Sequence, residues 1–202
     1  MLKLFTQRNM VAAFKTNAGN IALAVDHFGD RFYQATTFGG YYARSLGTNV
    51  DLGIGFHYNH MRIPGYLRLG SISADLGLMM HFTEKLHGGF SVNYAVGNPL
   101  PIKKLIPLFR SGLGYEVSEV FFLSVEVIKT DGSPASVLAG FQYRPVAVLQ
   151  LRGGINAISH QPFLGAGVRL GQICLDVTAA YHLQLGFSPG CMLRYDFKKS
   201  AQ

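Results

Sequence analysis

Hydrophobic and polar residues alternate along most of this chain with a period of two. Between residues 50 and 60, one parity holds the apolar side chains and the other holds the polar ones: Val50, Leu52, Ile54, Phe56 and Tyr58 against Asp51, Gly53, Gly55, His57 and Asn59. Successive side chains of a β-strand point to opposite faces, so this pattern is typical of a strand with one apolar and one polar face. The alternation recurs in residues 72–82, 86–97, 172–183 and 187–197. The chain is therefore predicted to be all-β.

Breaks in the alternation divide the chain into about thirteen predicted strands. They cover residues 10–17, 19–28, 32–45, 50–59, 70–82, 87–97, 108–117, 119–129, 135–144, 147–157, 162–171, 172–183 and 187–197. Short turns near residues 46–49, 83–85, 118, 144–146 and 171 alternate with longer connections near 60–69, 97–107, 129–134, 157–162 and 184–186. Tight turns at one end and longer loops at the other are typical of an antiparallel up-and-down transmembrane β-barrel.

An odd number of strands leaves this barrel incomplete, because bacterial outer-membrane barrels have an even number and keep both chain ends in the periplasm. We expect a further strand, formed by residues 2–6 or upstream of Met1, and about fourteen strands in the complete barrel. Residues 1–10 lack the apolar core of a signal peptide, so we expect the signal upstream as well. We interpret residues 1–202 as one barrel domain, with 1–9 as a poorly defined N-terminal segment and 198–202 as a periplasmic tail.

The composition narrows the class of protein. The 202 residues are 49% hydrophobic and 14% charged, with 24 Gly and two Cys, whereas ordinary soluble domains carry about 25% charged residues. These values exclude a disordered chain, a coiled coil and a disulfide scaffold. No run of about 18 apolar residues occurs, so no membrane helix is expected. A membrane β-barrel or an unusually apolar soluble β protein remains, and only the second would be released without detergent.

The polar parity is predicted to line a crowded lumen. It is rich in Gly, Ser, Asn, Gln and His, and it holds charges of both signs, which favours an interior where charges pair across strands. The luminal candidates are Asp51, His57, Asp75, His81, His87, Arg110, Glu116, Glu126, Arg144, Arg152, Arg169, Asp176, His182 and Arg194. We expect carboxylates to face the arginines, and Asp51 and Asp75 to form salt bridges with them.

The net charge of +7 is spread along the chain, whereas a nucleic-acid site requires a basic stripe. Nucleic acid is therefore not an expected partner, and anionic lipid headgroups or lipopolysaccharide are the expected counter-charges. Arg62, Lys103 and Lys104 lie in the predicted loops at 61–65 and 99–107. These loops form the most plausible extracellular surface for a protein partner, and contact of their basic residues with lipopolysaccharide explains them equally well.

Sites for metals, cofactors and catalysis are weakly supported. His81 and His87 flank one predicted turn, but a structural metal site needs three or four ligands, and the spacing offers no third. Ser159 and His160 share a loop, with Asp131 in another loop, and loop polarity explains them without a catalytic triad. We expect no cofactor, no metal and no enzymatic activity.

The two cysteines fall on opposite parities of neighbouring predicted strands, Cys174 on the luminal one and Cys191 on the lipid-facing one. Opposite faces do not allow the close Cβ approach of a disulfide. Both cysteines are therefore predicted to be unpaired.

Several phrases of the chain resemble the PorV/PorQ-type outer-membrane barrels of Bacteroidota, relatives of the FadL fatty-acid channels. The resemblance covers roughly residues 20–197 and rests on YYARSLGTNVDLGIGFHYNHMRIPGY at 41–66, ADLGLMMHFTEKLHGGFSVNYAVGNP at 74–99, GLGYEVSEVFFLSVEVIK at 112–129, GFQYRPVAVLQLRGGIN at 140–156, GAGVRL at 165–170 and LDVTAAYHLQLGFSPGCMLRYDF at 175–197. The residues Leu193–Phe197 also resemble the carboxy-terminal signal read by barrel-assembly machinery. The predicted extracellular loops are short and the amino-terminal part of the family is absent from the chain.

Two functions follow from these observations. The resemblance implies a non-enzymatic barrel of a bacterial outer membrane that works with type IX secretion or surface attachment, with secretion-system or surface proteins as partners. The kinship with FadL channels implies the alternative, a conduit for small or hydrophobic solutes. An accessory barrel predicts a plugged lumen and a stable protein partner, whereas a channel predicts a measurable pore.

Overall fold

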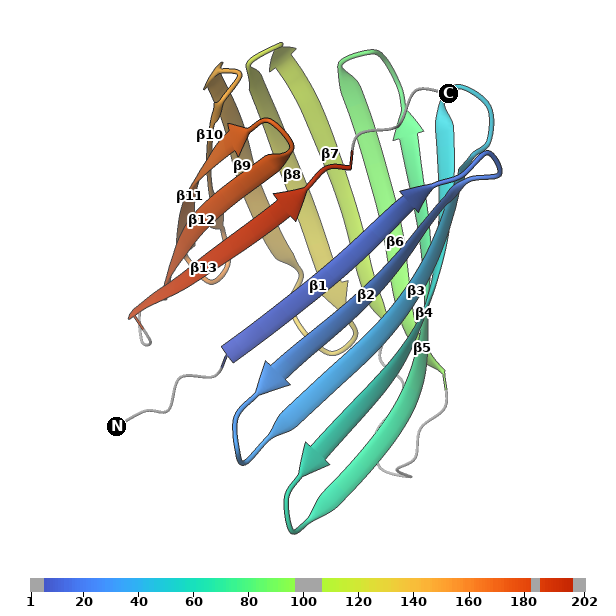
Figure 1. The fold of residues 1–202 in the computed structure, drawn as a ribbon. Coiled ribbons are helices and arrows are strands. Elements are labelled where there is room, and N and C mark those ends of the chain that lie inside the picture. Colours follow the sequence, from blue (N-terminus) through green and yellow to red (C-terminus); the bar gives the residue numbers. More distant parts are fainter. Residues whose placement is uncertain (1–5, 97–106, 183–185, 198–202) are drawn as a thin grey trace. The chain divides into compact units, whose positions relative to one another are not determined.

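The computed structural model describes residues 6–96, 107–182 and 186–197, and these residues form one antiparallel sheet of 13 strands (Figure 1). The strands are β1 (Thr6–Lys15), β2 (Asn20–Gly29), β3 (Gln34–Ser45), β4 (Val50–Ile63), β5 (Leu67–His81), β6 (Leu86–Val96), β7 (Leu108–Ser118), β8 (Phe121–Thr130), β9 (Ser136–Val146), β10 (Leu149–Asn156), β11 (Gln161–Leu170), β12 (Ile173–His182) and β13 (Gly186–Tyr195). Each strand is hydrogen-bonded to the next one along the chain, so the topology is up-and-down. Within the described ranges, no helix is long and apolar enough to span a membrane.

All thirteen predicted strands are confirmed, because the period-two pattern is strong enough to place every one of them. The largest differences are at β1, which begins at Thr6 rather than residue 10, and at β4, which ends at Ile63 rather than residue 59. At β9 and β10 the register shifts between Leu149 and Leu151, so one irregularity interrupts the ladder there.

The predicted long connection at residues 60–69 is wrong. Pairing of β4 with β5 continues to Ile63 and Leu67, and only three residues link the two strands. Gly65 closes this turn at a φ of 83°, a backbone conformation that glycine adopts without steric cost. Arg62, predicted to lie in a loop, is therefore a strand residue paired with Gln34 on β3 and Arg68 on β5. Polar side chains on the apolar parity of these strand ends explain the error.

Turn lengths alternate as predicted in the second half of the chain only. Residues 119–120, 147–148 and 171–172 form two-residue turns, while residues 131–135 and 157–160 form longer ones. In the first half, residues 16–19, 30–33, 46–49 and 82–85 give turns of equal length. The predicted connections at 97–107 and 184–186 lie almost wholly outside the described residues, as do Lys103 and Lys104.

The chain divides into two compact units. Unit 1 comprises Met1–His81, Gly89–Arg110 and Thr130–Ser133, and therefore contains β1 to β5 with most of β6. Unit 2 comprises Phe82–Gly88, Ser111–Lys129 and Pro134–Gln202, and contains most of β7 and β8 together with β9 to β13.

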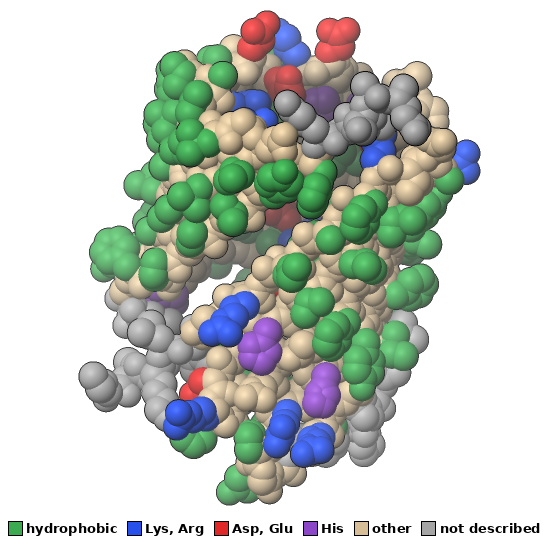
Figure 2. All heavy atoms as spheres, viewed as in Figure 1, with side chains coloured by type: hydrophobic (Ala, Val, Ile, Leu, Met, Phe, Trp, Pro, Cys, Tyr) green, Lys and Arg blue, Asp and Glu red, His purple; other side chains and the backbone are tan. Residues whose placement is uncertain are grey.

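In each unit the sheet exposes apolar side chains and shelters polar ones. In unit 1, Phe56 is 62% exposed and Ile72 is 53% exposed, while Ser73 is only 5% exposed. In unit 2, Leu164 is 66% exposed, while Asp176 and Cys174 are each 3% exposed. Figure 2 shows hydrophobic side chains spread over the surface that its view presents. A water-soluble domain would bury such side chains, so this distribution is the inverse of a soluble core.

Candidate functional site

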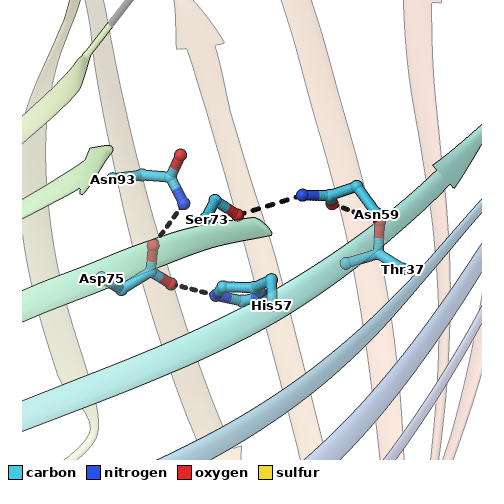
Figure 3. Close-up of polar contacts among 6 residues, drawn as sticks. All are labelled: Thr37, His57, Asn59, Ser73, Asp75 and Asn93. Carbon is cyan, nitrogen blue, oxygen red and sulfur yellow. Dashed lines mark hydrogen bonds and ion pairs between the residues drawn. The ribbon is translucent and has the colours of Figure 1, made fainter. Parts of the chain in front are cut away.

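The polar face of unit 1 carries a ladder of hydrogen-bonded side chains from four neighbouring strands (Figure 3). Thr37 on β3 donates to the Asn59 side-chain oxygen on β4 at 2.9 Å, and the Asn59 amide donates to Ser73 Oγ on β5 at 3.1 Å. The carboxylate of Asp75 on β5 pairs with the His57 imidazole on β4 and accepts a hydrogen bond from the Asn93 amide on β6. Because all these groups bond across strands, they fix the register of β3 to β6 as well as line the polar face.

Tyr41 and two glycines shape the space around the His57–Asp75 pair. The Tyr41 and His57 rings meet edge to face, with their centroids 5.1 Å apart. A Cβ on Gly55 would lie 2.8 Å from the Tyr41 ring, and a Cβ on Gly39 would lie 3.0 Å from His57 Nδ1. The absence of a side chain at both positions therefore leaves room for the tyrosine ring and the imidazole against the sheet.

A hollow of about 480 Å³ opens on this polar face beside Asp75. Gly53 pairs with Ala43 on one side and with Gly77 on the other, so three strands present almost no side-chain volume there. Polar and aromatic groups line part of the hollow around this small-residue floor, among them Tyr41, Asp75, Ser91, Asn93 and Arg110, and apolar residues such as Leu76 and Val92 complete the lining. The arrangement gives hydrogen-bond donors and acceptors of both charges around a space large enough for a small polar solute.

Asp51 and His81 form a second imidazole–carboxylate pair in unit 1. His81 Nε2 lies 2.9 Å from Asp51 Oδ2, and both side chains are about one-third exposed. Asp51 and Asp75 were expected to pair with arginines, but the structure gives each of them a histidine partner. The physical reason is register: a histidine lies on the next strand within reach of each carboxylate, which sequence parity alone does not reveal.

In unit 2, an ion pair joins two strands that are not adjacent in the sheet. The Arg152 guanidinium on β10 lies 3.2 Å from Asp176 Oδ1 on β12, across the intervening β11. Gly167 on β11 is directly opposite Asp176, and a Cβ at that position would lie 2.1 Å from Asp176 Oδ1. Cys174 Sγ also donates to Asp176 at 3.5 Å. The missing side chain of Gly167 is therefore what allows the carboxylate to lie over β11 and meet Arg152.

The remaining candidates occupy more peripheral positions. His87 Nε2 and Glu116 Oε1 are 3.7 Å apart, and Arg194 Nε lies 3.4 Å from Asp196 Oδ1 on its own segment. Glu126 lies beside the bare backbone of Gly112, and His182 is half-buried at the end of β12.

Arg144 and Arg169 depart from the expectation that carboxylates face the arginines. Both are exposed near the ends of β9 and β11, and neither forms an ion pair with any described residue. Only their backbones are tied to a neighbouring strand end: the Arg144 N–H donates to the Val120 carbonyl and the Arg169 N–H donates to the Val148 carbonyl, each at 2.8 Å.

Sequence reasoning missed Tyr41, Thr37, Asn59, Ser73 and Asn93 as members of the site. All lie on the polar parity of their strands, and this parity was the signal in the sequence that could have identified them. The sequence does not show the cross-strand register that brings them together. The free cysteines agree with prediction, since Cys174 is buried and Cys191 is exposed. Among the residues that the structure describes, no three His, Cys, Asp or Glu side chains gather as metal ligands.

No protein-family model matches the chain, and no curated protein matches it. Among solved structures, the chain is similar in fold to a porin of Rhodobacter blastica carrying five substitutions, with a TM-score of 0.52, 10% identity, and coverage of 96% of this chain and 90% of the porin. A form of the same porin with three substitutions gives a TM-score of 0.51 at 10% identity, with the same coverage. These likenesses establish an antiparallel up-and-down β-sheet of the porin barrel type, and neither points to the PorV/PorQ or FadL families.

Proposed function

We propose that this chain forms a β-barrel of a bacterial outer membrane and serves as a passive conduit for small polar solutes. One observation carries the proposal: in both units, strand after strand exposes large apolar side chains on one face and shelters hydrogen-bonded polar groups on the other. Lipid on the apolar face and water on the polar face would satisfy both sets of side chains. The porin-like fold supports the same assignment.

The chemistry of the polar face indicates which solutes would pass. The polar part of the lining of the hollow of about 480 Å³ comes from Tyr41, Asp75, Ser91, Asn93 and Arg110, whose groups offer both donors and acceptors. A fatty-acid tail cannot form hydrogen bonds with these groups, whereas a small hydrophilic solute can. This favours hydrophilic solutes over the hydrophobic cargo that FadL kinship implied.

Conductance in a planar lipid bilayer tests the proposal. The refolded chain is expected to produce discrete current steps, and Arg110→Gln is expected to lower its preference for anions, because it removes a positive charge from the polar face. Arg44→Gln is the matched control, since Arg44 is paired with Leu52 on the apolar parity and would not face the pore. A bilayer that contains correctly folded protein but shows no current steps would contradict the proposed conduit. Identical changes of ion selectivity in both variants would contradict the assignment of the faces.

An accessory role in secretion or surface attachment is a second candidate. Side chains on the polar faces bond one another across strands, as in the Arg152–Asp176 pair and the ladder ending at Asn93, and such cross-linking suits an interior that is filled rather than open. Extraction in mild detergent followed by mass spectrometry separates the two functions. A stoichiometric protein partner together with absent conductance would support the accessory role, and release without any detergent would contradict both.

A further inference from the structure

The apolar face of unit 1 changes character at one end of β1 to β5. One cross-strand row on this face is wholly apolar and comprises Met10, Val25, Phe38, Tyr58 and Ile72. The next row, two residues further along each strand, comprises Arg8, His27, Thr36, His60 and Gly70, and the row after it contains Gln34, Arg62 and Arg68. We call Arg8, His27, His60, Arg62 and Arg68 the basic rim. Figure 2 shows Lys or Arg and His side chains gathered at this end, beyond the hydrophobic ones.

The strand period separates bases from acids at this end. Positions between the rim residues point to the opposite, polar face, where Asp26 accepts a hydrogen bond from Asn9. The nearby Asp30 lies in the turn of residues 30–33 and accepts hydrogen bonds from the backbone N–H groups of Phe32 and Tyr33, at 2.8 and 3.2 Å. In the part of the chain that the structure describes, no carboxylate forms an ion pair with the rim arginines.

Two of the rim arginines are direct cross-strand neighbours. Arg62 on β4 is paired in register with Arg68 on β5, and both are exposed. Like charges directly opposite each other in a sheet are destabilising, so an anion between the two guanidinium groups would stabilise the pair. A phosphate group fits this role best, because guanidinium binds it through two parallel N–H donors at once.

The rim also lies at the right level of the sheet for a lipid headgroup. Phe38 and Tyr58, in the apolar row just before it, are 52% and 50% exposed, as expected of aromatic residues at a membrane–water boundary. Two residues along a strand correspond to roughly 6–7 Å. The basic rim would therefore begin where hydrocarbon gives way to headgroups.

We infer that the basic rim binds the phosphate groups of lipopolysaccharide, and that Arg62 and Arg68 together bind one phosphate between them. The inference rests on the proposed function, which places the apolar face against lipid. With the two-residue turns at 119–120, 147–148 and 171–172 on the periplasmic side, the up-and-down topology directs the turns at 30–33 and 64–66 to the cell surface. The leaflet there is built from lipopolysaccharide, whose lipid anchor carries phosphates.

Native mass spectrometry of the intact chain in mild detergent tests the assignment. The probes are diphosphorylated lipid A, its dephosphorylated form, phosphatidylglycerol and inorganic phosphate. The double variant Arg62→Gln/Arg68→Gln is expected to bind diphosphorylated lipid A about thirtyfold more weakly, since each basic side chain near an anionic surface contributes about fivefold. Arg44→Gln, on the same face at the opposite end, is the matched control and is expected to bind as the unmodified chain does.

Each result bears on the inference. Selective binding of phosphorylated lipid A that is lost only in the Arg62→Gln/Arg68→Gln variant supports the inference. Partial recovery of this binding in Arg62→Lys/Arg68→Lys also supports it, because lysine keeps the positive charge. Equal binding by all variants overturns it, as does equal binding of phosphatidylglycerol, which would indicate any anionic phospholipid, or competition by inorganic phosphate at similar concentration. Failure here while the chain still requires detergent and conducts ions leaves the proposed function intact. Release of the chain without detergent overturns both.

Discussion

Gly167→Ala is the substitution for which the structure gives the sharpest expectation. Gly167 lies in the interior of β11, directly opposite Asp176, which is 3% exposed and paired with Arg152. A Cβ added at Gly167 would lie 2.1 Å from Asp176 Oδ1 and 2.9 Å from its carboxyl carbon. Carbon and oxygen do not approach so closely without a bond, so the carboxylate must move away from the strand and from Arg152.

Two terms set the size of the effect. Forcing an extra methyl group into a filled position costs about 1–3 kcal/mol. Separating a buried charge from its partner costs about 3–5 kcal/mol, but Arg152 is 31% exposed and water will replace part of the lost interaction. We therefore expect a loss of about 3 kcal/mol in the free energy of unfolding.

Gly77→Ala is the matched control, because Gly77 also lies on a polar face and the nearest atom to its added Cβ, the Gly53 carbonyl oxygen, is 4.0 Å away. Its effect should be neutral or stabilising by about 0.5 kcal/mol, since alanine restricts the unfolded chain. The chain has no tryptophan. Urea unfolding in lipid vesicles is therefore followed by far-UV circular dichroism and by the shift in electrophoretic mobility between folded and unfolded protein.

A double-mutant cycle isolates the contact itself. Asp176→Ser removes the carboxylate that the alanine would strike, so it should cost less in the Gly167→Ala background than in the unmodified chain. The reasoning is refuted if Gly167→Ala is as stable as Gly77→Ala, or if the two substitutions at positions 167 and 176 are simply additive.

Two further substitutions test the assignment of the faces and the polar ladder. Phe56→Arg should destabilise the folded state in lipid vesicles by about 2–4 kcal/mol, because it places a charge on the lipid face; the same stability as the unmodified chain, measured by urea titration, would contradict that assignment. Asp75→Asn should cost about 1.5–3 kcal/mol, because it removes the charged acceptor shared by His57 and Asn93. A loss equal to that of Asp30→Asn, at a carboxylate held only by turn backbone, would show that the ladder contributes nothing specific.

The sequence by itself determined the strands and their faces. A period of two that recurs along most of the chain leaves no competing helical pattern, so strand number and the apolar parity could be predicted from the residues alone. The same parity correctly placed Cys174 and Cys191 on opposite faces and put His57, Asp75, Arg152 and Asp176 on the polar one. Local pattern suffices for these features because each depends only on a residue's neighbours along its own strand.

Only the tertiary structure decided which side chains meet. The sequence predicted arginine partners for Asp51 and Asp75, but register supplies His81 and His57, since a shift of two residues between strands leaves parity unchanged while replacing every partner. The pairing of Arg62 with Arg68 could not be predicted either. Polar residues on the apolar parity look like a loop in the sequence, and only the hydrogen-bond ladder shows that the strands continue. Cross-strand register depends on contacts distant in sequence, and these form only when the whole sheet does.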